Sequence, residues 1–312
     1  MDRSDTGGAA GKVQRPEDGL RMVLADNPSP MTYRGTNTYI VGSGAVAVID
    51  PGPDDARHMA AILAALQPGE RISHILVTHA HLDHSPLSRA LSGRTGAPVL
   101  AFGAAGAGRS ATMAALADAG HLRGSEGVDT GFAPDMTLAE GDMVRGGDWA
   151  LRAIHTPGHF ANHLSFAATL PGGPVIFTGD HVMGWATSLV SPPDGDMGAY
   201  FRSLDRLVGE PARRFYPGHG EAILDPAARI AELRSHRKMR EAQILAALAP
   251  GPAHAATLTR SIYVDTPPAL LPAAERNVLA HLIDLTEQGR VTHPGPIAPS
   301  TEFRLAEAAK IF

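Results

Sequence analysis

Short apolar runs separated by turn residues dominate the first quarter of the chain. The runs at residues 20–24, 37–41 and 46–50 predict strands, and the last two flank Gly42-Ser43-Gly44, which predicts a β-hairpin. From Asp55 onward the apolar positions recur at helical spacing until Pro68-Gly69. This pattern predicts a helix that packs one face against the sheet.

Three later segments repeat one arrangement, in which a β-prone run enters a turn that contains glycine and then a side chain able to bind metal. The runs are 151–156, 175–178 and 214–216, and the side chains that follow them are His159, Asp180 and His219. Strands that end at one edge of a sheet bring such residues together in a crevice.

The last quarter predicts a long helix and then a small separate unit. The helix begins at Asp225-Pro226, which suits a helix cap and first turn, and runs to about residue 249 before Pro250-Gly251-Pro252 breaks it. Helices over 257–264 and 275–288, followed by a hairpin over 290–305, then predict a winged-helix-like module. The expected organisation is therefore a flexible terminus at 1–18, a main domain at 19–249 and a winged-helix-like domain at 250–312.

Two connecting segments carry weaker signals. Ser85-Pro86 suits the cap and first turn of a short helix. Residues 103–135 are rich in glycine and alanine and predict an excursion with a helix over one rim, whose role as a lid, a substrate wall or a purely structural segment stays open.

The segment 78–84 reads Thr-His-Ala-His-Leu-Asp-His directly after the apolar run 75–77, so a buried strand opens into a polar loop. Side chains two apart in an extended segment project to the same side, so His79 and His81 can grip one ion. Asp83 and His84 lie past the bend and can face a second ion. With His159, Asp180 and His219 they supply the seven ligands that two four-coordinate ions sharing one carboxylate require.

Composition limits the class of protein and the metal. The 312 residues are 44% hydrophobic with a formal net charge of −5 and no cysteine. Imidazole and carboxylate must then hold any metal, which suits zinc, iron or manganese. The mild charge does not indicate a nucleic-acid binder or a membrane-surface protein, and the chain lacks a long apolar run and a signal-peptide core. We expect a cytoplasmic protein without a membrane partner; the sequence leaves its oligomeric state open, with a homodimer as one alternative.

These motifs resemble the metallo-β-lactamase superfamily over roughly residues 20–225. The matching features are Asp50-Pro51-Gly52, the motif at 79–84, His159, Asp180 and His219. Gly35-Thr36-Asn37-Thr38-Tyr39, Thr156-Pro157-Gly158-His159 and the C-terminal unit resemble the lactamase-like protein 2 group, whose studied members act on single-stranded RNA. The resemblance implies an αββα sandwich of the α/β class with a small winged-helix-like domain at its C-terminus.

The resemblance also implies a ligand set and a reaction. His79, His81 and His159 would hold one Zn²⁺, Asp83, His84 and His219 the other, and Asp180 would bridge them, with iron or manganese as alternative metals. A hydroxide between the ions would attack a phosphodiester of single-stranded RNA type, or a small ester or thioester. Asp83 would also orient this hydroxide, and His163 and His181 are the candidates for the acid that protonates the leaving group, with support of a metal ligand as the competing role.

Departures from the family narrow the reaction. Asp180 is present and cysteine is absent, which disfavours a β-lactam substrate. A mononuclear iron persulfide dioxygenase shares much of this ligand pattern, so an oxidoreductase is the second hypothesis. A binding protein with a structural metal is the third.

Other polar and aromatic residues receive less specific roles. We expect Asp50 to orient a ligand loop and His155 to pack within its strand. Trp185, Ser188 and Tyr200 could line a substrate pocket or fill the core. The basic run at 234–240 could bind phosphates or form a solvated helix face, and the solvated face is the expectation.

Overall fold

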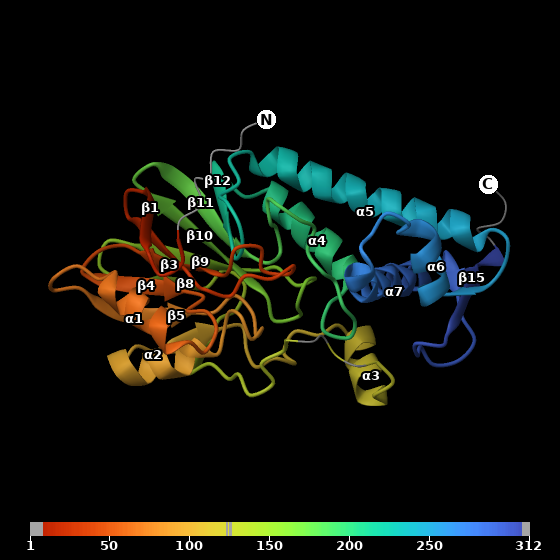
Figure 1. Cartoon of the computed structure of the whole chain (residues 1–312), viewed down its shortest axis with the longest axis horizontal. Coiled ribbons are helices and arrows are strands. Elements are labelled where there is room, and N and C mark those ends of the chain that lie inside the picture. The colour runs from red at the N-terminus through yellow and green to blue at the C-terminus, as the bar shows by residue number, and fades with distance from the viewer. Residues whose placement is uncertain (1–8, 123, 125–126, 308–312) are drawn as a thin grey trace.

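A computed structural model describes residues 9–122, 124 and 127–307. Two mixed sheets pack face to face, and helices cover both outer faces, in the αββα order that the sequence predicts (Figure 1). The first sheet is antiparallel from its first to its fourth strand and parallel beyond. In spatial order its strands are β1 (Val13–Glu17), β2 (Leu20–Leu24), β3 (Asn37–Val41), β4 (Ala45–Ile49), β5 (Arg71–Leu76), β6 (Val99–Ala101) and β7 (Met136–Thr137).

The second sheet supplies the other half of the sandwich. It is antiparallel except for its β11–β12 pair, which is parallel. Its strands in spatial order are β12 (Arg214–Pro217), β11 (Gly173–Gly179), β10 (Leu164–Leu170), β9 (Ala150–His155) and β8 (Met143–Arg145). The strands expected at 151–156, 175–178 and 214–216 correspond to β9, β11 and β12 of this sheet. β11 and β12 are neighbours, and β10 lies between β9 and β11.

The main core lies between the two sheets, because alternate residues of each strand face inward. Tyr39 of β3 and Phe177 of β11 meet there with ring centroids 5.1 Å apart, and Leu76 of β5 and Phe166 of β10 are fully buried around them. Removing a buried ring of this size costs about 3–5 kcal/mol in a typical core. The inner faces thus hold the strand ends, and the loops that follow them, at fixed relative positions.

Helices bury apolar stripes on the two outer faces. On the first sheet, α1 (Ala56–Ala64) contributes Ile62 and α2 (Leu87–Thr95) contributes Leu91. On the second sheet, α4 (Met197–Val208) contributes Leu204 and α5 (Pro226–Leu248) contributes Leu233. The hairpin of β3 and β4, the helix after Asp55 and the long helix after Asp225 are confirmed.

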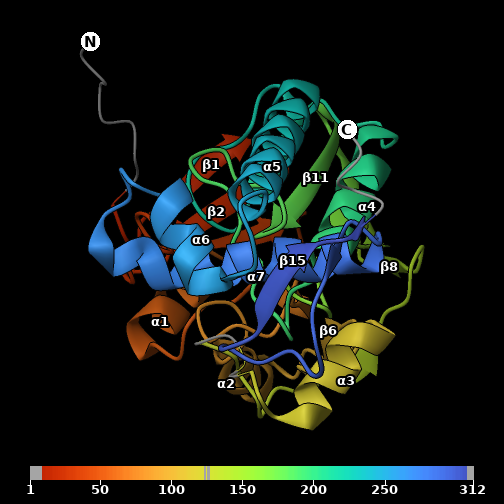
Figure 2. The ribbon, with the colours of Figure 1, turned by 90° about the vertical axis from the view of Figure 1, so that its right-hand side faces the viewer.

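The C-terminal unit consists of short helices and a small three-stranded sheet. Its elements are β13 (Ala253–His254), α6 (Ala255–Ile262), the 3₁₀ helix η1 (Pro268–Leu270), α7 (Leu271–Glu287), β14 (Val291–Thr292) and β15 (Glu302–Leu305). The two helices and the hairpin expected from the sequence are present. A core of its own includes Leu258, Leu282 and Phe303, and the far end of α5 joins it through Ile244. Figures 1 and 2 show α5 passing from the sandwich to this unit.

Two local expectations are wrong. The flexible terminus expected at 1–18 contains strand β1, which pairs with β2 through Val13 and Gln14, while residues 1–8 lie outside the described residues. Ser85 does not cap α2, since Pro86 occupies the cap position and no side chain bonds to the helix end. The Ser85 hydroxyl instead contacts the His81 carbonyl and the Asp129 carboxylate, at 3.0 and 2.8 Å, so it ties down the metal-motif loop.

The excursion at 103–135 contains helix α3 (Ala111–Ala119), as expected, although residues 123, 125 and 126 of it lie outside the described residues. Its Met113 and Leu116 pack with the core of the C-terminal unit. Leu82 lies in the metal-motif loop, and its N–H donates a hydrogen bond to the carbonyl of Gly127 in this segment, at 2.7 Å. The segment therefore connects the metal-motif loop with the C-terminal unit.

Among the helices in the described ranges, none combines the length and the apolar character needed to span a bilayer.

Candidate metal centre

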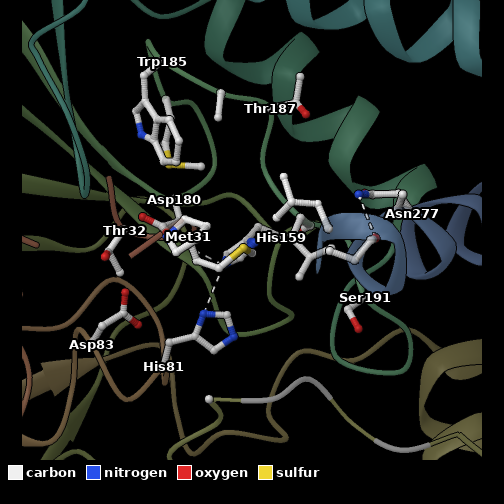
Figure 3. A pocket seen from close by; sticks show the side chains of 18 of the residues that line it. Met31, Thr32, His81, Asp83, His159, Asp180, Trp185, Thr187, Ser191 and Asn277 are labelled. Carbon is white, nitrogen blue, oxygen red and sulfur yellow. Dashed lines mark hydrogen bonds and ion pairs between the residues drawn. The ribbon is translucent and has the colours of Figure 1, made fainter. Parts of the chain in front are cut away.

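All seven predicted ligands come together at one edge of the sandwich. The loop after β5 carries four of them, and the turns after β9, β11 and β12 carry one each. They form two groups, and within each group the candidate ligand atoms all lie within 4.8 Å of one another. Figure 3 shows His81, Asp83, His159 and Asp180 gathered at one side of a cavity. The groups are His79, His81 and His159, and Asp83, His84, Asp180 and His219.

In the first group, three imidazole nitrogens converge. His81 Nδ1 lies 3.0 Å from His79 Nε2 and 3.2 Å from His159 Nε2. Burial lowers the pKa of all three rings, and the neighbouring imidazoles lower it further for His79 and His81, which brings the pKa of His81 to about 3. The rings are therefore neutral at pH 7, which is the form that binds a metal.

The second group mixes two imidazoles with two carboxylates. His219 Nε2 lies 3.1 Å from Asp83 Oδ2, 3.3 Å from Asp180 Oδ2 and 3.3 Å from His84 Nε2. Burial acts to lower the pKa of His219, but Asp180 and Asp83 outweigh it and raise the pKa to about 9. The two carboxylates of this group favour a positive charge beside them. Protons on the histidines supply that charge without a metal, and a divalent ion would supply it in their place.

The carboxylate of Asp180 reaches both groups. One oxygen, Oδ2, lies 3.3 Å from His219 Nε2 and 3.9 Å from His159 Nε2. The other, Oδ1, is buried and lies 3.4 Å from His84 Nε2. A Cβ on Gly218 would lie 2.4 Å from that oxygen and 2.7 Å from His84 Cε1, so only glycine leaves room here. Asp180 thus has the position expected of a bridging ligand.

The observed spacings fit a pair of metal ions. Ligand nitrogens at about 2.0–2.1 Å from a tetrahedral zinc lie roughly 3.3 Å apart. The nitrogens of the first group, at 3.0 and 3.2 Å, are close to this value, and so is the His84–His219 pair of the second, at 3.3 Å. Neutral imidazoles that direct lone pairs at one point repel one another unless a cation lies between them. The donor set of nitrogen and oxygen atoms without sulfur suits zinc, iron or manganese equally.

Hydrogen bonds on the far side of the rings set their tautomers. His159 Nδ1 faces the Leu189 carbonyl at 2.6 Å, and His219 Nδ1 faces the Gly35 carbonyl at 3.1 Å. Each carbonyl can only accept, so each Nδ1 carries the hydrogen and leaves the Nε2 lone pair for the metal.

Asp50 orients ligands of both groups, as expected. It accepts from the Thr78 N–H at 2.7 Å and from the Thr78 hydroxyl at 2.8 Å, and its Oδ2 lies 2.9 Å from His84 Nδ1. The Thr78 hydroxyl, which donates to Asp50, must then accept from His79 Nδ1 at 2.9 Å. One carboxylate therefore orients His84 directly and His79 through Thr78, and each ring keeps its Nε2 free.

The two acid candidates lie away from the cavity. His163 is fully buried, contacts the Thr156 hydroxyl at 2.9 Å through Nδ1, and accepts from the Asp180 N–H at 3.2 Å through Nε2. His181 is also fully buried, and neither of its ring nitrogens has a partner in the described part of the chain. The His163 contacts favour support of the Asp180 backbone, and the acid role of both residues stays a prediction that their burial argues against.

A cavity of about 710 Å³ opens beside the metal ligands. Its walls come from the 27–32 loop, the 183–191 loop, α5 and the C-terminal unit. Trp185 lines it as the sequence suggested, and stacks on Tyr33 with ring centroids 5.1 Å apart. Ser188 and Tyr200 do not line the cavity: the Ser188 hydroxyl donates to the Asp180 carbonyl at 2.6 Å, and Tyr200 is buried against the His181 ring. His155 lies in β9 and stacks on Phe102, as expected of a packing residue.

The expectation for the basic run 234–240 is wrong in part. Arg234 and Lys238 are on the outer face of α5, but Arg237 is buried, and His236, Arg237 and Arg240 line the cavity. The i, i+3 spacing of Arg237 and Arg240 places them on one face of a helix, and this spacing was the available signal. Asn277 of α7 lines another side of the cavity (Figure 3), and no sequence pattern pointed to it.

An αββα sandwich with two groups of histidine and aspartate ligands at one sheet edge defines a metal-binding protein of the metallohydrolase type. Residues 31–219 match the metallo-beta-lactamase superfamily, and residues 255–296 match the beta-lactamase associated winged helix domain. The chain belongs to the metallo-beta-lactamase superfamily and carries this winged helix at its C-terminus, as the sequence resemblance implied.

Relatives of known name resemble the chain at about 30% identity. The Drosophila melanogaster "Beta-lactamase-like protein 2 homolog" is 31% identical over 289 residues, covering 89% of this chain and 91% of the relative. The Aspergillus chevalieri "Atrochrysone carboxyl ACP thioesterase" is 32% identical over 240 residues, covering 76% of this chain and 68% of the relative.

Solved structures share the fold along nearly the whole chain. A beta-lactamase domain protein from Burkholderia ambifaria superposes with a TM-score of 0.79 at 23% identity, covering 97% of this chain and 96% of the other. A metallo-beta-lactamase family protein from Thermus thermophilus gives a TM-score of 0.72 at 26% identity, covering 92% and 98%. The sandwich and the C-terminal unit therefore occur together in other proteins.

Proposed function

We propose that the protein is a dinuclear metal-dependent hydrolase that cleaves an ester-type bond. The observation that carries this proposal is the position of Asp180, whose carboxylate lies between the two ligand groups and within 3.9 Å of nitrogens in both. Two divalent ions held here would supply a hydroxide nucleophile at neutral pH and neutralise charge on the reacting oxygens.

The residues of the chain hold and orient the reacting groups. His79, His81 and His159 would hold one ion, Asp83, His84 and His219 the other, and Asp180 both. Asp83 lines the cavity beside His81 and is less enclosed than His84, His159 and His219, so its carboxylate can also accept a hydrogen bond from the nucleophile. The pKa of Asp83 lies well below its usual range: burial acts to raise it, but His84 and His219 outweigh burial. Asp83 is therefore an acceptor at neutral pH.

The substrate that we favour is a small ester or thioester. The cavity has the volume typical of small-molecule sites, and it is walled on several sides by apolar side chains such as Met31, Trp185 and Leu189. The ACP thioesterase relatives support the same choice. A phosphodiester of single-stranded RNA, which the resemblance to the lactamase-like protein 2 group suggests, is the second candidate.

The two alternatives from the sequence differ from this proposal in metal content. A mononuclear iron oxygenase would need ligands for one ion only, typically two histidines and one carboxylate. The presence of two ligand groups favours two ions. A binding protein with a structural metal would need ligand atoms to close the coordination of both ions. The contact of His81, Asp83, His159 and Asp180 with the cavity leaves access for water and substrate.

The test combines metal analysis with hydrolysis. Protein purified without added metal is analysed for metal content, and is then assayed with thioester, aryl ester and single-stranded RNA substrates before and after chelation. We expect about two ions per chain, chelator-sensitive activity, and a loss of at least about 100-fold in kcat for Asp180→Ala, since removing a group that positions both metal and nucleophile has effects of this order.

The matched control is Glu232→Ala, which removes a carboxylate on α5 that is 68% exposed, while its partner Arg229 keeps its bonds to the Met183 and Ala186 carbonyls. It should keep full activity and metal content. One iron per chain with oxygen uptake, or unchanged hydrolysis in Asp180→Ala, would contradict the proposal.

A further inference from the structure

Helix α5 carries several cations, and those on its outer side are paired with carboxylates. Arg229 Nη1 lies 2.7 Å from Glu232, Arg234 contacts Asp205, and Lys238 Nζ lies 2.8 Å from Glu241. The carboxylates of Glu232 and Asp205 are exposed, as is ordinary for pairs on a helix surface, whereas Glu241 is only 5% exposed. Glu232, Asp205 and Glu241 are therefore already paired with other cations of the helix.

Arg237 differs from these cations, because it is 1% exposed and no carboxylate among the described residues is within ion-pair distance of it. Its guanidinium donates to the Ser188 carbonyl and to Asn277 Oδ1, the latter at 3.0 Å, and lies 5.2 Å from the centre of the Tyr200 ring. Its Nε is buried without a partner in the described part of the chain. All its partners are neutral, so its charge is not compensated.

Arg240 lies one helical turn away and is partly exposed, and it too has neutral partners. Its Nη1 donates to Gln243 at 2.9 Å, its guanidinium lies 4.2 Å from the centre of the Tyr263 ring, and its Nε is buried without a partner among the described residues. No ion pair to it occurs within the described ranges. Arg237 and Arg240 both line the cavity that the metal ligands line.

A guanidinium that is withdrawn from water without a counter-ion is costly, so such a group is normally paired. The guanidinium groups of Arg237 and Arg240 on one wall of the cavity produce a local positive potential that an anion can neutralise. The planar fork of arginine suits the two oxygens of a carboxylate or a phosphate. The described carboxylates that line the cavity, Asp83 and Asp180, are bound to His84 and His219 and do not supply this anion.

A short backbone segment links this wall to the metal ligands. Ser188 gives its carbonyl to Arg237, and the next residue, Leu189, gives its carbonyl to His159 Nδ1 at 2.6 Å. Asn277 fixes the same segment, because its Oδ1 also accepts from the Val190 N–H at 3.0 Å. This segment therefore fixes the distance between an anion bound by the arginines and the substrate bond that is cleaved at the metal centre.

We propose that Arg237 and Arg240 form an anion-binding subsite, and that the substrate is an ester or thioester whose acyl or leaving part carries a carboxylate or phosphate group away from the bond that is cleaved. This inference rests on the proposed function for the cleaved bond, but the subsite itself does not. Apolar parts of the substrate lie against Trp185 and Met31, and the anion contacts the partly exposed Arg240, with the buried charge of Arg237 one helical turn away.

The first experiment measures binding without catalysis. Metal-loaded protein is titrated by calorimetry with phenylphosphonate and with benzoate, which carry the two anion types on the same ring, and with benzyl alcohol as the neutral analogue. We expect Arg240→Gln to weaken binding of the preferred anion by at least about tenfold, a change of about 1.4 kcal/mol. Arg237→Lys should also weaken it, and Arg234→Gln, a cation paired with Asp205 on the same helix, should not.

Anion binding directly to the metal ions is distinguished by its response to these variants. Binding at the ions alone would be abolished by chelation and unchanged in Arg240→Gln, and this result would overturn the subsite. Absence of measurable binding of both anions to the parent protein would also overturn it. Arg240 is partly exposed, so its variant tests the inference even if Arg237→Lys does not fold.

A second experiment separates the subsite from the hydrolase proposal. Mono-4-nitrophenyl succinate and 4-nitrophenyl acetate share a leaving group, and the acyl part of the succinate carries one additional CH2–CO2⁻ group. We expect kcat/KM for the succinate to fall about tenfold in Arg240→Gln while the value for the acetate is unchanged. Anion binding without hydrolysis of any ester would contradict only the proposed function, and hydrolysis with equal loss for both esters would contradict only the subsite.

Discussion

Asp50 Oδ2 lies 2.9 Å from His84 Nδ1, and the same carboxylate holds Thr78, which in turn holds His79. A single side chain outside both ligand groups thus orients one ligand of each. Its backbone has φ of +50°, in the left-handed region, which places the carboxylate under the loop. Asparagine tolerates this backbone conformation nearly as well, so it is the appropriate replacement.

We predict that Asp50→Asn lowers metal affinity at both positions by about 10–100-fold, the usual effect of losing such a partner. The amide cannot accept from Thr78 and His84 as strongly as the carboxylate does. Competition with a chromogenic chelator measures the affinity, and circular dichroism checks the fold. The exposed carboxylate Asp265, replaced by Asn, is the control. Loss of metal at one position only would show that the Thr78 relay to His79 has no effect.

We predict that His181→Leu keeps hydrolysis within about threefold of the parent and is at least as stable. Burial and the neighbouring cation Arg237 leave this imidazole neutral, and both of its nitrogens lack partners in the described part of the chain. Replacing an unsatisfied buried polar group by an apolar group of similar size is neutral or favourable, because it removes the desolvation cost of the polar group, typically about 1–3 kcal/mol. Steady-state kinetics and urea unfolding measure the two effects, and a large fall in kcat alone would restore the acid role.

We predict that Arg21→Met destabilises the fold by about 3–5 kcal/mol, because it leaves a buried carboxylate unpaired. Arg21 Nη1 lies 2.5 Å from Glu70 Oε2, and the two side chains are only 4% and 7% exposed. Arg21 also donates to the carbonyls of Ala65 and Gly42, at 3.0 Å each, so it joins the end of α1 to the β3–β4 turn.

Urea unfolding measures this loss. The double variant Arg21→Met, Glu70→Gln should recover part of it, because the remaining group is then neutral. The pair Arg57 and Asp55, which is exposed on the surface, provides the comparison: Arg57→Met should change stability by less than about 1 kcal/mol. Equal effects of the two arginine substitutions would contradict the assignment.

We predict that Asp284→Asn stabilises the protein at pH 7.5 and has no effect at pH 4. Burial, and then the carboxylates of Glu241 and Asp196, raise the pKa of Asp284 from its ordinary value to about 6. The folded state therefore binds a proton more tightly than the unfolded state does. Stability from this group is complete below about pH 4 and is lost as the pH rises to about 6.

The expected gain for Asp284→Asn at pH 7.5 is about 1–2 kcal/mol. Asparagine keeps the shape and can accept from Gln288 Nε2, which donates to Asp284 at 2.8 Å. Thermal unfolding at pH 4, 5, 6 and 7.5 gives the profile, and Asp265→Asn should leave it unchanged. A gain that is the same at every pH would show that packing, and not ionisation, causes it.

The metal centre could be predicted because each ligand lies in a short local pattern. His79, His81, Asp83 and His84 follow one strand, and the other three ligands follow three strands in turns that contain glycine. Strand periodicity and the rule that strand ends share an edge were enough to bring them together. The role of Asp50 was predicted from the family resemblance, because Asp50-Pro51-Gly52 is one of the features that carry it.

The cavity walls could not be predicted, because they arise from contacts between distant elements. Asn277 meets Arg237 across 40 positions, and Arg237 meets Ser188 across 49. A basic run on a helix is usually solvated, and Arg237 is buried because Ser188, Tyr200 of α4 and Asn277 of α7 contact it. Strand β1 was missed for a related reason, since its Val13 and Gln14 become ordered by pairing with β2 and carry little apolar pattern of their own.

Helix α5 connects the αββα sandwich with the C-terminal unit, so its length affects the shape of the substrate cavity between them. Its 23 residues are anchored on the second sheet by Ile230 and Leu233, and on the winged helix by Ile244 and Leu248, with the cavity-facing arginines between these anchors. The helix is therefore a rigid spacer, and the winged helix closes a site whose chemistry resides elsewhere. Chimaeras that exchange residues 250–307 between homologues are expected to change which molecules are accepted without altering how their bonds are broken.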